Sequence, residues 1–209
     1  GIQSNFSAYI SEEVDLNDQL KGIFGLRLEN YKQYYTGVNQ DGSRLYDNEL
    51  VLSDNTIISE SDTISVGLYP SASIIFNIDK KSNLRGSVFR TTARPSFKEK
   101  SNAQILDVLS GVTFNGNIDL ISTIIYNYDI RYETYYDDGQ TIAISGFLKD
   151  LYNPIEIVAY SADEDNIQPI NSGNAKLMGV EFEARKKLDE FISGLSANLN
   201  ASYIHSEVT

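Results

Sequence analysis

The stretch Asn127-Tyr128-Asp129-Ile130-Arg131-Tyr132-Glu133 alternates polar and apolar residues without interruption. Successive side chains of a β-strand point to opposite faces, so a period of two separates the two residue types. One face carries three apolar or aromatic side chains and the other three charged ones: Tyr128, Ile130 and Tyr132 against Asp129, Arg131 and Glu133. The stretch therefore predicts a strand with one apolar and one charged face.

The same alternation recurs along the rest of the chain. In one further segment, Met178, Val180 and Phe182 alternate with Glu181 and Glu183. The predicted strands cover residues 5–14, 20–31, 71–79, 84–94, 125–136, 141–152, 176–188 and 195–208. We therefore expect an all-β fold, an antiparallel up-and-down meander of about eight strands.

The connections between these strands alternate between short and long. The short ones are residues 15–19, 80–83, 137–140 and 189–194, and the long ones are residues 32–70, 95–124 and 153–175. Asp138-Gly139 is a strong hairpin signal, because glycine accepts a positive φ. Residues 97–109 lack β alternation, and Ile105, Leu106 and Leu109 predict a short helical turn there. Tight turns at one end and long loops at the other are typical of transmembrane β-barrels.

Alternation alone does not say which face is inside, because a soluble barrel buries its apolar face and a membrane barrel exposes it. The asymmetry of the two ends favours the membrane, since lipid distinguishes one end from the other. Tyrosines also gather near predicted strand ends, as in the aromatic girdles of membrane barrels. They are Tyr31, Tyr34, Tyr35, Tyr126, Tyr128, Tyr135, Tyr136 and Tyr152.

Composition narrows the function. The 209-residue chain has a formal net charge of −12, which makes nucleic acid a poor partner, and it has no cysteine. No run of 18 apolar residues and no signal peptide occurs, and the start at Gly1 leads us to expect a processed or excised piece. His205 is the single histidine, and the acidic run Asp163-Glu164-Asp165 fits a solvated loop. We expect no enzyme activity, no cofactor and no metal site.

Five segments in order resemble those of TonB-dependent outer-membrane receptors. They are the strand-end pair Arg94-Pro95, the loop pair Gly116-Asn117, the strand with Asn127, Asp129, Arg131 and Glu133, the pair Asn153-Pro154, and Gly179-Val180-Glu181-Phe182-Glu183. The resemblance spans about residues 84–188. The first eighty residues are similar to the family only in style.

The resemblance implies a 22-stranded barrel, plugged by an N-terminal domain, in the outer membrane of a Gram-negative bacterium. It implies energised uptake of a scarce large nutrient: a siderophore–metal chelate, a cobalamin, an oligosaccharide or a peptide. The implied partners are outer-membrane lipid, a plug domain of the same parent chain, TonB, and an extracellular ligand bound by loops 32–70, 95–124 and 153–175. Arginine and glutamate of the charged face would line the lumen.

Twenty-two strands of ~10 residues need ~220 residues before any loop, so eight strands are about a third of such a barrel. We therefore expect residues 1–209 to be a partial barrel domain without plug, N-terminal TonB box or closing strand. Two alternatives stay open: a soluble eight-stranded barrel that binds a small apolar ligand, and a surface or fibre-forming protein that assembles through its edges. A complete small membrane barrel is a third. Burial of Ile130, Val180 and Leu199 in a dry interior would contradict the membrane interpretation.

Overall fold

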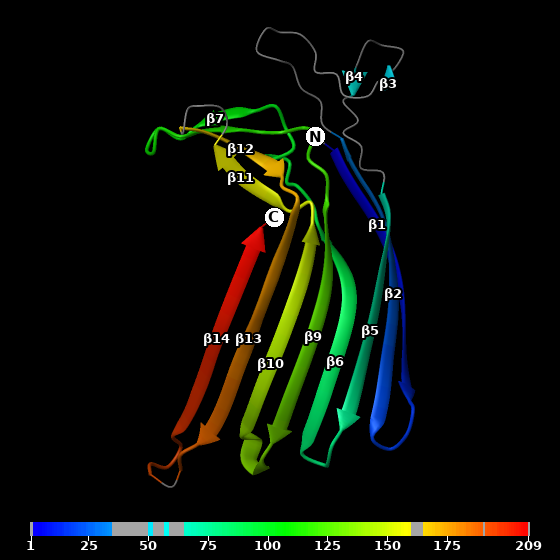
Figure 1. Ribbon diagram of the computed structural model, residues 1–209, viewed down its shortest axis with the longest axis vertical. Helices are drawn as coiled ribbons and strands as arrows, with labels where there is room; N and C mark the ends of the chain where they lie inside the picture. Colours follow the sequence, from blue (N-terminus) through cyan, green and yellow to red (C-terminus); the bar gives the residue numbers. More distant parts are fainter. Residues whose placement is uncertain are drawn as a thin grey trace.

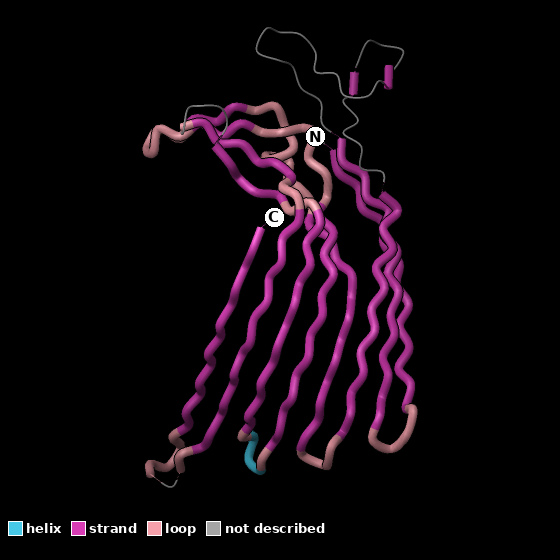
Figure 2. The backbone as a smooth tube through the Cα atoms, in the orientation of Figure 1, coloured by secondary structure: helices cyan, strands magenta, loops and turns pink. Residues whose placement is uncertain are grey.

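A computed structural model describes residues 2–34, 50–51, 57–58, 65–159, 165–189 and 191–208. Most of them form one eight-stranded antiparallel sheet in which each long strand pairs with the next long strand along the chain. The strands, in sheet order, are β1 (Ile2–Asp15), β2 (Leu20–Tyr34), β5 (Ser65–Asn77), β6 (Ser82–Ala93), β9 (Thr123–Tyr135), β10 (Thr141–Tyr152), β13 (Asn174–Lys187) and β14 (Ser196–Val208). The predicted meander is confirmed (Figures 1 and 2).

The strand boundaries follow the alternation closely, with one larger difference. β10 has the predicted bounds, whereas β5 begins at Ser65 and takes Pro70 into a strand where a loop was expected. The one helical element described is the short 3-10 turn η1 (Asp137–Gly139), and Gly139 there has φ = 76°, as the turn signal predicted. No described helix has the length and apolar character needed to cross a membrane.

The long connections contain strands of their own. β7 (Gln104–Leu106), β8 (Thr113–Asn115), β11 (Ile155–Ala159) and β12 (Asn166–Asn171) form a second sheet, the loop sheet, in the order β11-β12-β8-β7. It lies at the end opposite the short turns (Figure 1), while β3 (Leu50–Val51) and β4 (Ile57–Ile58) form a separate pair. The predicted helical turn at Ile105 and Leu106 is wrong, because both residues pair with β8 as a strand.

The register of the large sheet sets the slope of its strands. The last pair of the first hairpin is Asp15↔Lys21, and following the partners of Lys21 across the sheet leads to Glu181 on β13. Glu181 lies six residues from Lys187, the last paired residue of the fourth hairpin. The path from Asp15 to Glu181 crosses six strand spacings, so the register shifts by one residue per strand. One residue of ~3.3 Å per strand spacing of ~4.8 Å gives a tilt of about 35°. This slope lies within the 35–45° range of membrane barrels.

One ladder of the sheet is incomplete. Pairing between β5 and β6 stops at Ser71↔Phe89, although residues 67–70 still pair with β2 and residues 90–93 still pair with β9. The two strands part at the loop end (Figure 1). We call this unpaired stretch, residues 67–70 and 90–93, the seam.

Pro70 explains where the seam begins. The N–H of Asn77 donates toward β2, to Gln19 O at 2.7 Å, and the N–H of Ile78 donates toward β6, to Ser82 O at 3.0 Å. Because these directions alternate along a strand, the backbone N–H and C=O groups of the even-numbered residues of β5 point toward β6. Pro70 is the first even position beyond the ladder, and it has no N–H to donate.

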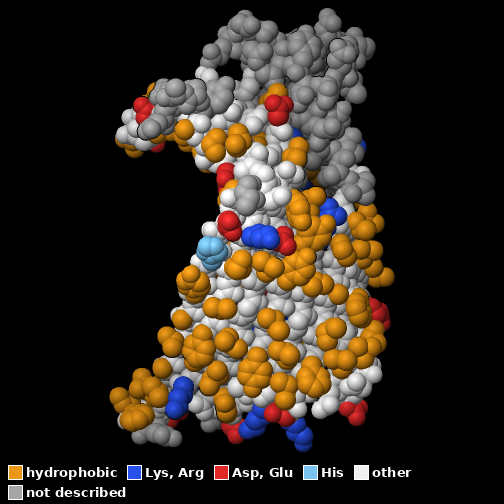
Figure 3. Space-filling model, in the orientation of Figure 1, with side chains coloured by type: hydrophobic (Ala, Val, Ile, Leu, Met, Phe, Trp, Pro, Cys, Tyr) orange, Lys and Arg blue, Asp and Glu red, His pale blue; other side chains and the backbone are white. Residues whose placement is uncertain are grey.

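The apolar face of the sheet is the more exposed face, and the charged face is the more buried one. On the apolar face, the exposed fractions of Ile130, Val180 and Leu199 are 56%, 53% and 57%. On the charged face, Asn127 and Glu133 are 4% and 5% exposed. Figure 3 shows hydrophobic side chains spread over the strands of the apolar face. The residues expected outside a membrane barrel are therefore exposed, and β1 and β14 remain unpaired edges of an open sheet.

Candidate functional site

The middle of the charged face carries a network centred on Arg131 of β9. Its guanidinium donates to Glu133 at 2.8 Å, to Glu183 at 3.1 Å and to the hydroxyl of Ser145 at 3.0 Å. Arg85 lies 3.6 Å from the other carboxylate oxygen of Glu133. Direct strand pairing across β6, β9, β10 and β13 brings these residues to one face, so interleaved opposite charges satisfy one another.

A second cluster lies at the loop end of the same face. Arg94, which follows β6, donates to Glu29 of β2 and lies 4.3 Å from the ring centre of Tyr31. Arg27 contacts the other oxygen of Glu29 at 2.6 Å, and the hydroxyl of Tyr31 donates to Gln33 at 3.0 Å. Glu29 is almost fully buried, so removing either arginine would leave its carboxylate with less compensation for its lost hydration.

The loop sheet joins two long connections into one platform. Asn117 donates to Pro169 O at 3.0 Å, and Gln168 donates to Gly116 O at 3.2 Å. Asn171 accepts from the N–H of Ile121 at 2.8 Å and donates to the carbonyls of Ile121 and Asn153. All but the bond to Asn153 connect residues about fifty positions apart. They thus hold the described parts of residues 95–124 and 153–175 together.

A buried lysine links two parts of residues 95–124. Lys100 is 1% exposed, and its ammonium donates to Leu120 O at 2.6 Å. At the outer tip, by contrast, Val108 and Leu109 are 83% and 96% exposed. The carboxylate of Asp107 closes that turn by accepting from the N–H of Leu109 and from the hydroxyl of Ser110. These two hydrogen bonds, the first more than the second, hold the pKa of the Asp107 carboxyl below its ordinary value. The platform therefore presents two apolar side chains on a tight turn.

The structure divides the predicted motif residues into two groups. Those on the charged face of the strands are Asn127, Asp129, Arg131, Glu133, Gly179, Glu181 and Glu183. Those at the loop end are Arg94, Pro95, Gly116, Asn117, Asn153 and Pro154. Asn127 donates to Thr91 and Phe89 within the wall, and Phe147 packs over Gly179, where a Cβ would meet its ring at 2.7 Å.

Several contributors were not foreseen. Glu29, Lys100 and Asn171 each act through a partner far along the chain, so no local spacing marks them. The tyrosine prediction holds for three residues of the apolar face near the loop end, Tyr126, Tyr128 and Tyr152, of which Tyr126 and Tyr152 touch edge to face at 5.8 Å. It is wrong for Tyr31, which is buried on the charged face, and for Tyr135, which lies on that face and hydrogen-bonds Glu133. Tyr35 and the side chain of Tyr34 lie outside the described residues, as do Asp163 and Glu164.

The apolar face has the height of a bilayer core. On β13, Met178, Val180, Phe182 and Ala184 lie between Lys176 and Lys186. Ten residues span ~33 Å along a strand, which a tilt of ~35° reduces to about 27 Å. Membrane barrels have an apolar band ~25 Å tall. At the loop end the band stops at a row of charged side chains across neighbouring strands: Arg90, Asp150, Lys176 and Glu207.

Comparison with known proteins agrees with this geometry. A family model described as "TonB dependent receptor-like, beta-barrel" matches residues 1–209. A search of curated proteins found no match. Among solved structures, the siderophore receptor PirA from Pseudomonas aeruginosa aligns over 99% of this chain with a TM-score of 0.70 and 16% identity.

Two further structures align over the same extent. They are the alcaligin outer-membrane receptor FauA from Bordetella pertussis (15% identity, TM-score 0.61) and the FrpB iron transporter from Neisseria meningitidis (16% identity, TM-score 0.59), each over 99% of this chain. The chain spans 35% of PirA, 30% of FauA and 26% of FrpB. At this identity the likeness shows a shared fold.

Proposed function

This chain belongs to the family of TonB-dependent receptor β-barrels, and from that premise we propose that it supplies about a third of the wall of one such barrel. The family and its structural relatives are transport receptors rather than enzymes. The observation that carries the proposal is the inverted burial of the two faces. Ile130 and Val180 are exposed in a band of bilayer height, while Glu133 is buried on the opposite face.

The orientation follows from the two ends of the sheet. The four short turns face the periplasm, and the loop sheet faces the medium, as in barrels with short periplasmic turns and long outer loops. The charged face then lines the lumen, where the Arg131 and Arg94 clusters contact a plug domain of the same parent chain. TonB engages that parent chain through its N-terminal part. The host is a Gram-negative bacterium.

The activity we propose is energised uptake of a scarce large nutrient, with a ferric siderophore as the first candidate. The support for that candidate is that PirA is a siderophore receptor, FauA an alcaligin receptor and FrpB an iron transporter. Cobalamin, oligosaccharide and peptide are the competing substrates. The platform formed by residues 95–124 and 153–175 is the proposed recognition surface of this segment, together with residues 32–70.

Membrane insertion is tested with spin labels on single cysteines in the full-length receptor, reconstituted in lipid bilayers. The native chain has no cysteine, so each label is unique within it. Labels at Ile130 and Leu199 should collide with oxygen dissolved in the bilayer, and a label at Asp129 with a water-soluble nickel chelate. The reverse pattern would contradict the proposal.

Uptake is tested separately in cells. Deleting the gene that encodes the receptor should abolish accumulation of radioactive iron supplied as a siderophore chelate under iron limitation. Unchanged iron uptake together with lost uptake of labelled cobalamin or oligosaccharide would keep the class and reject the siderophore. Loss of none of these would reject transport.

A further inference from the structure

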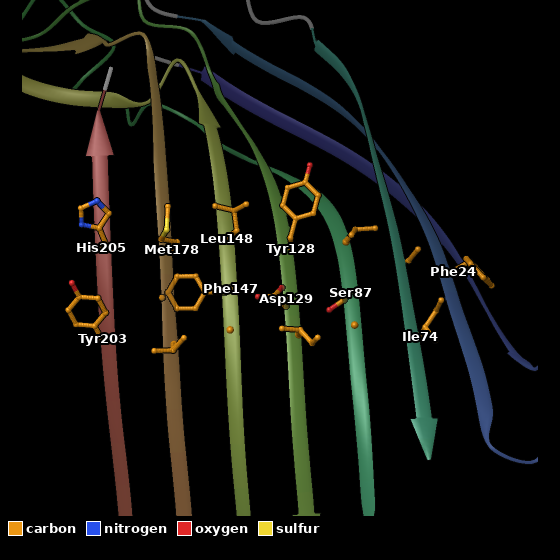
Figure 4. A pocket seen from close by; sticks show the side chains of 17 residues that line it. Phe24, Ile74, Ser87, Tyr128, Asp129, Phe147, Leu148, Met178, Tyr203 and His205 are labelled. Atoms are coloured by element: carbon orange, nitrogen blue, oxygen red, sulfur yellow. The ribbon is translucent and has the colours of Figure 1, made fainter. Parts of the chain in front are cut away.

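The apolar face is hollowed across its middle strands. A trough of about 920 Å³ crosses this face, and Figure 4 shows its walls on strands β2 to β14. Its floor and walls include Ile74, Gly86, Val88, Ile130, Gly146 and Val180. The hollow therefore lies on the side that the proposed function turns toward lipid.

Glycines produce the hollow. Gly86 and Gly146 are the strand partners of Ile130 on either side, and all three lie in one row across the sheet. A Cβ at Gly86 would meet nothing within 4 Å, and a Cβ at Gly146 would make an ordinary contact of 3.5 Å with Ile130. Glycine in a strand interior marks a bulge, a bend or the close approach of another molecule. The ladders pass through Gly86 and Gly146 without a bulge, which leaves a bend or such an approach.

The trough continues to the foot of the seam. A second hollow of about 290 Å³ shares Ala72, Val88 and Tyr128 with the first and adds Pro70, Tyr126 and Arg90. Together the two hollows form one groove. Its upper part lies where the ladder between β5 and β6 ends, because Pro70 cannot extend that ladder.

Arg90 is the charged residue of the upper hollow. Its Nη1 donates to Leu68 O at 3.2 Å, a carbonyl that the seam leaves without a partner on β6, and its guanidinium lies 5.7 Å and 6.0 Å from the ring centres of Tyr69 and Tyr126. Its Nε is buried and has no hydrogen-bond partner among the described residues. The nearest carboxylate of the same row, Asp150, is also the strand partner of Lys176.

We propose that this groove binds one lipid of the surrounding membrane that carries a phosphate headgroup, with the phosphate at Arg90 and an acyl chain over Gly86. The proposal rests on the proposed function, because this face meets lipid only in a membrane barrel. Arg90 is the first charged residue beyond Leu84, Gly86 and Val88 on this face of β6, so it marks the loop end of the apolar stretch of that strand. Arginine pairs with phosphate through charge-assisted hydrogen bonds.

Charge and shape together select this occupant. An apolar polypeptide would leave the guanidinium facing no counter-charge, and a lipid without a phosphate would gain nothing from it. Arg90 and Gly86 are four residues apart, about 13 Å along the strand, which an acyl chain spans from its headgroup. The groove therefore offers a polar end and an apolar end in the order of such a lipid.

The test places the full-length receptor in nanodiscs of mixed phosphatidylethanolamine and phosphatidylglycerol. The receptor is then released in a mild detergent, and native mass spectrometry measures which lipids stay bound to it. Arg90→Gln should lower retained phosphatidylglycerol roughly five- to tenfold. Gly86→Leu should reduce retention of both lipids by filling the trough. Lys176→Gln, in the same charged row but outside the groove, and Ala184→Leu, on the apolar face but outside it, are the matched controls and should retain lipid as the wild type does.

Three outcomes would contradict the proposed lipid site. They are equal retention by wild type and Arg90→Gln, an equal loss in Lys176→Gln, and a copurifying polypeptide that Gly86→Leu displaces in place of lipid. The Ile130 spin label separates the two proposals. Oxygen exposure at Ile130 with unchanged retention rejects the lipid site alone, whereas protection of Ile130 from both reagents rejects the membrane barrel.

Discussion

An arginine at the centre of the apolar band tests the membrane assignment most directly. Val180 lies four residues from Lys176 and six from Lys186, so it is within about one residue of the middle of the band. Arginine on the lipid face near the midplane costs about 2–4 kcal/mol. Val180→Arg should therefore shift the folding equilibrium by about 30- to 1,000-fold.

Two control variants test whether the cost of an arginine depends on its depth and on its face of the sheet. Met178→Arg lies two residues from Lys176, close to the headgroups, and should cost only about 0–1 kcal/mol. Ser202→Arg sits on the charged face opposite Glu181, at nearly the same height as Val180, and should change stability by less than about 0.5 kcal/mol. The cost should thus depend on face and depth, with the chemistry of the substitution held constant.

The assay is urea unfolding of the full-length barrel in phospholipid vesicles, followed by the change in electrophoretic mobility between folded and unfolded forms. Refolding from urea must give the same curve, so that free energies of unfolding can be compared. A neutral Val180→Arg combined with a destabilising Ser202→Arg would refute the reasoning. It would place the apolar face against protein and the charged face in contact with the bilayer.

Other consequences can be checked on the same protein. Arg94→Met should cost about 1–3 kcal/mol in urea unfolding, because buried Glu29 loses a charged donor, and adding Glu29→Gln should recover part of it. Asn171→Ala should raise amide hydrogen exchange in β8 and β12 while β9 stays protected; equal exchange in all three would contradict the platform. The depressed pKa of Asp107 predicts that the protection of the Leu109 amide, its exchange rate relative to the intrinsic rate at each pH, stays constant from pH 7 to pH 5. The protection should fall as pH drops below the ordinary carboxyl value of 3.8, since protonation removes the acceptor, and Asp107→Asn should abolish that pH dependence.

The long strands could be predicted because their signal is local. A period of two within residues 127–133 needs no distant partner to be visible, and short turns such as Asp138-Gly139 fix which strand follows. β10 was placed at its observed bounds for this reason. β5 was started too late because Pro70 argues against a strand, yet its missing N–H falls on the side where the ladder has already ended.

The platform could not be predicted because its signal is not local. β8 has three residues, too few for any period, and it becomes a strand through parallel pairing with β12, where Thr113 faces Asn166. The same reason hid the Glu29–Arg94 contact. The face of Tyr31, by contrast, is a local signal, because Tyr31 alternates in phase with Arg27 and Glu29. Local patterns give strands and faces, whereas pairing across fifty residues depends on how the sheet curves.

The number of paired charges on the charged face bears on the size of the barrel. A stagger of one residue per strand would allow eight strands to close into a ring whose interior side chains just fill. Six paired charges would then lie in a dry core: Arg27, Glu29, Arg85, Arg131, Glu133 and Glu183. Each such ion costs several kcal/mol to dehydrate, and pairing does not reliably repay it. A wide, water-filled ring keeps Arg131 and Glu183 partly hydrated while they remain paired. We therefore infer, independently of any relative, that β1 and β14 pair with further strands of a ring much larger than eight.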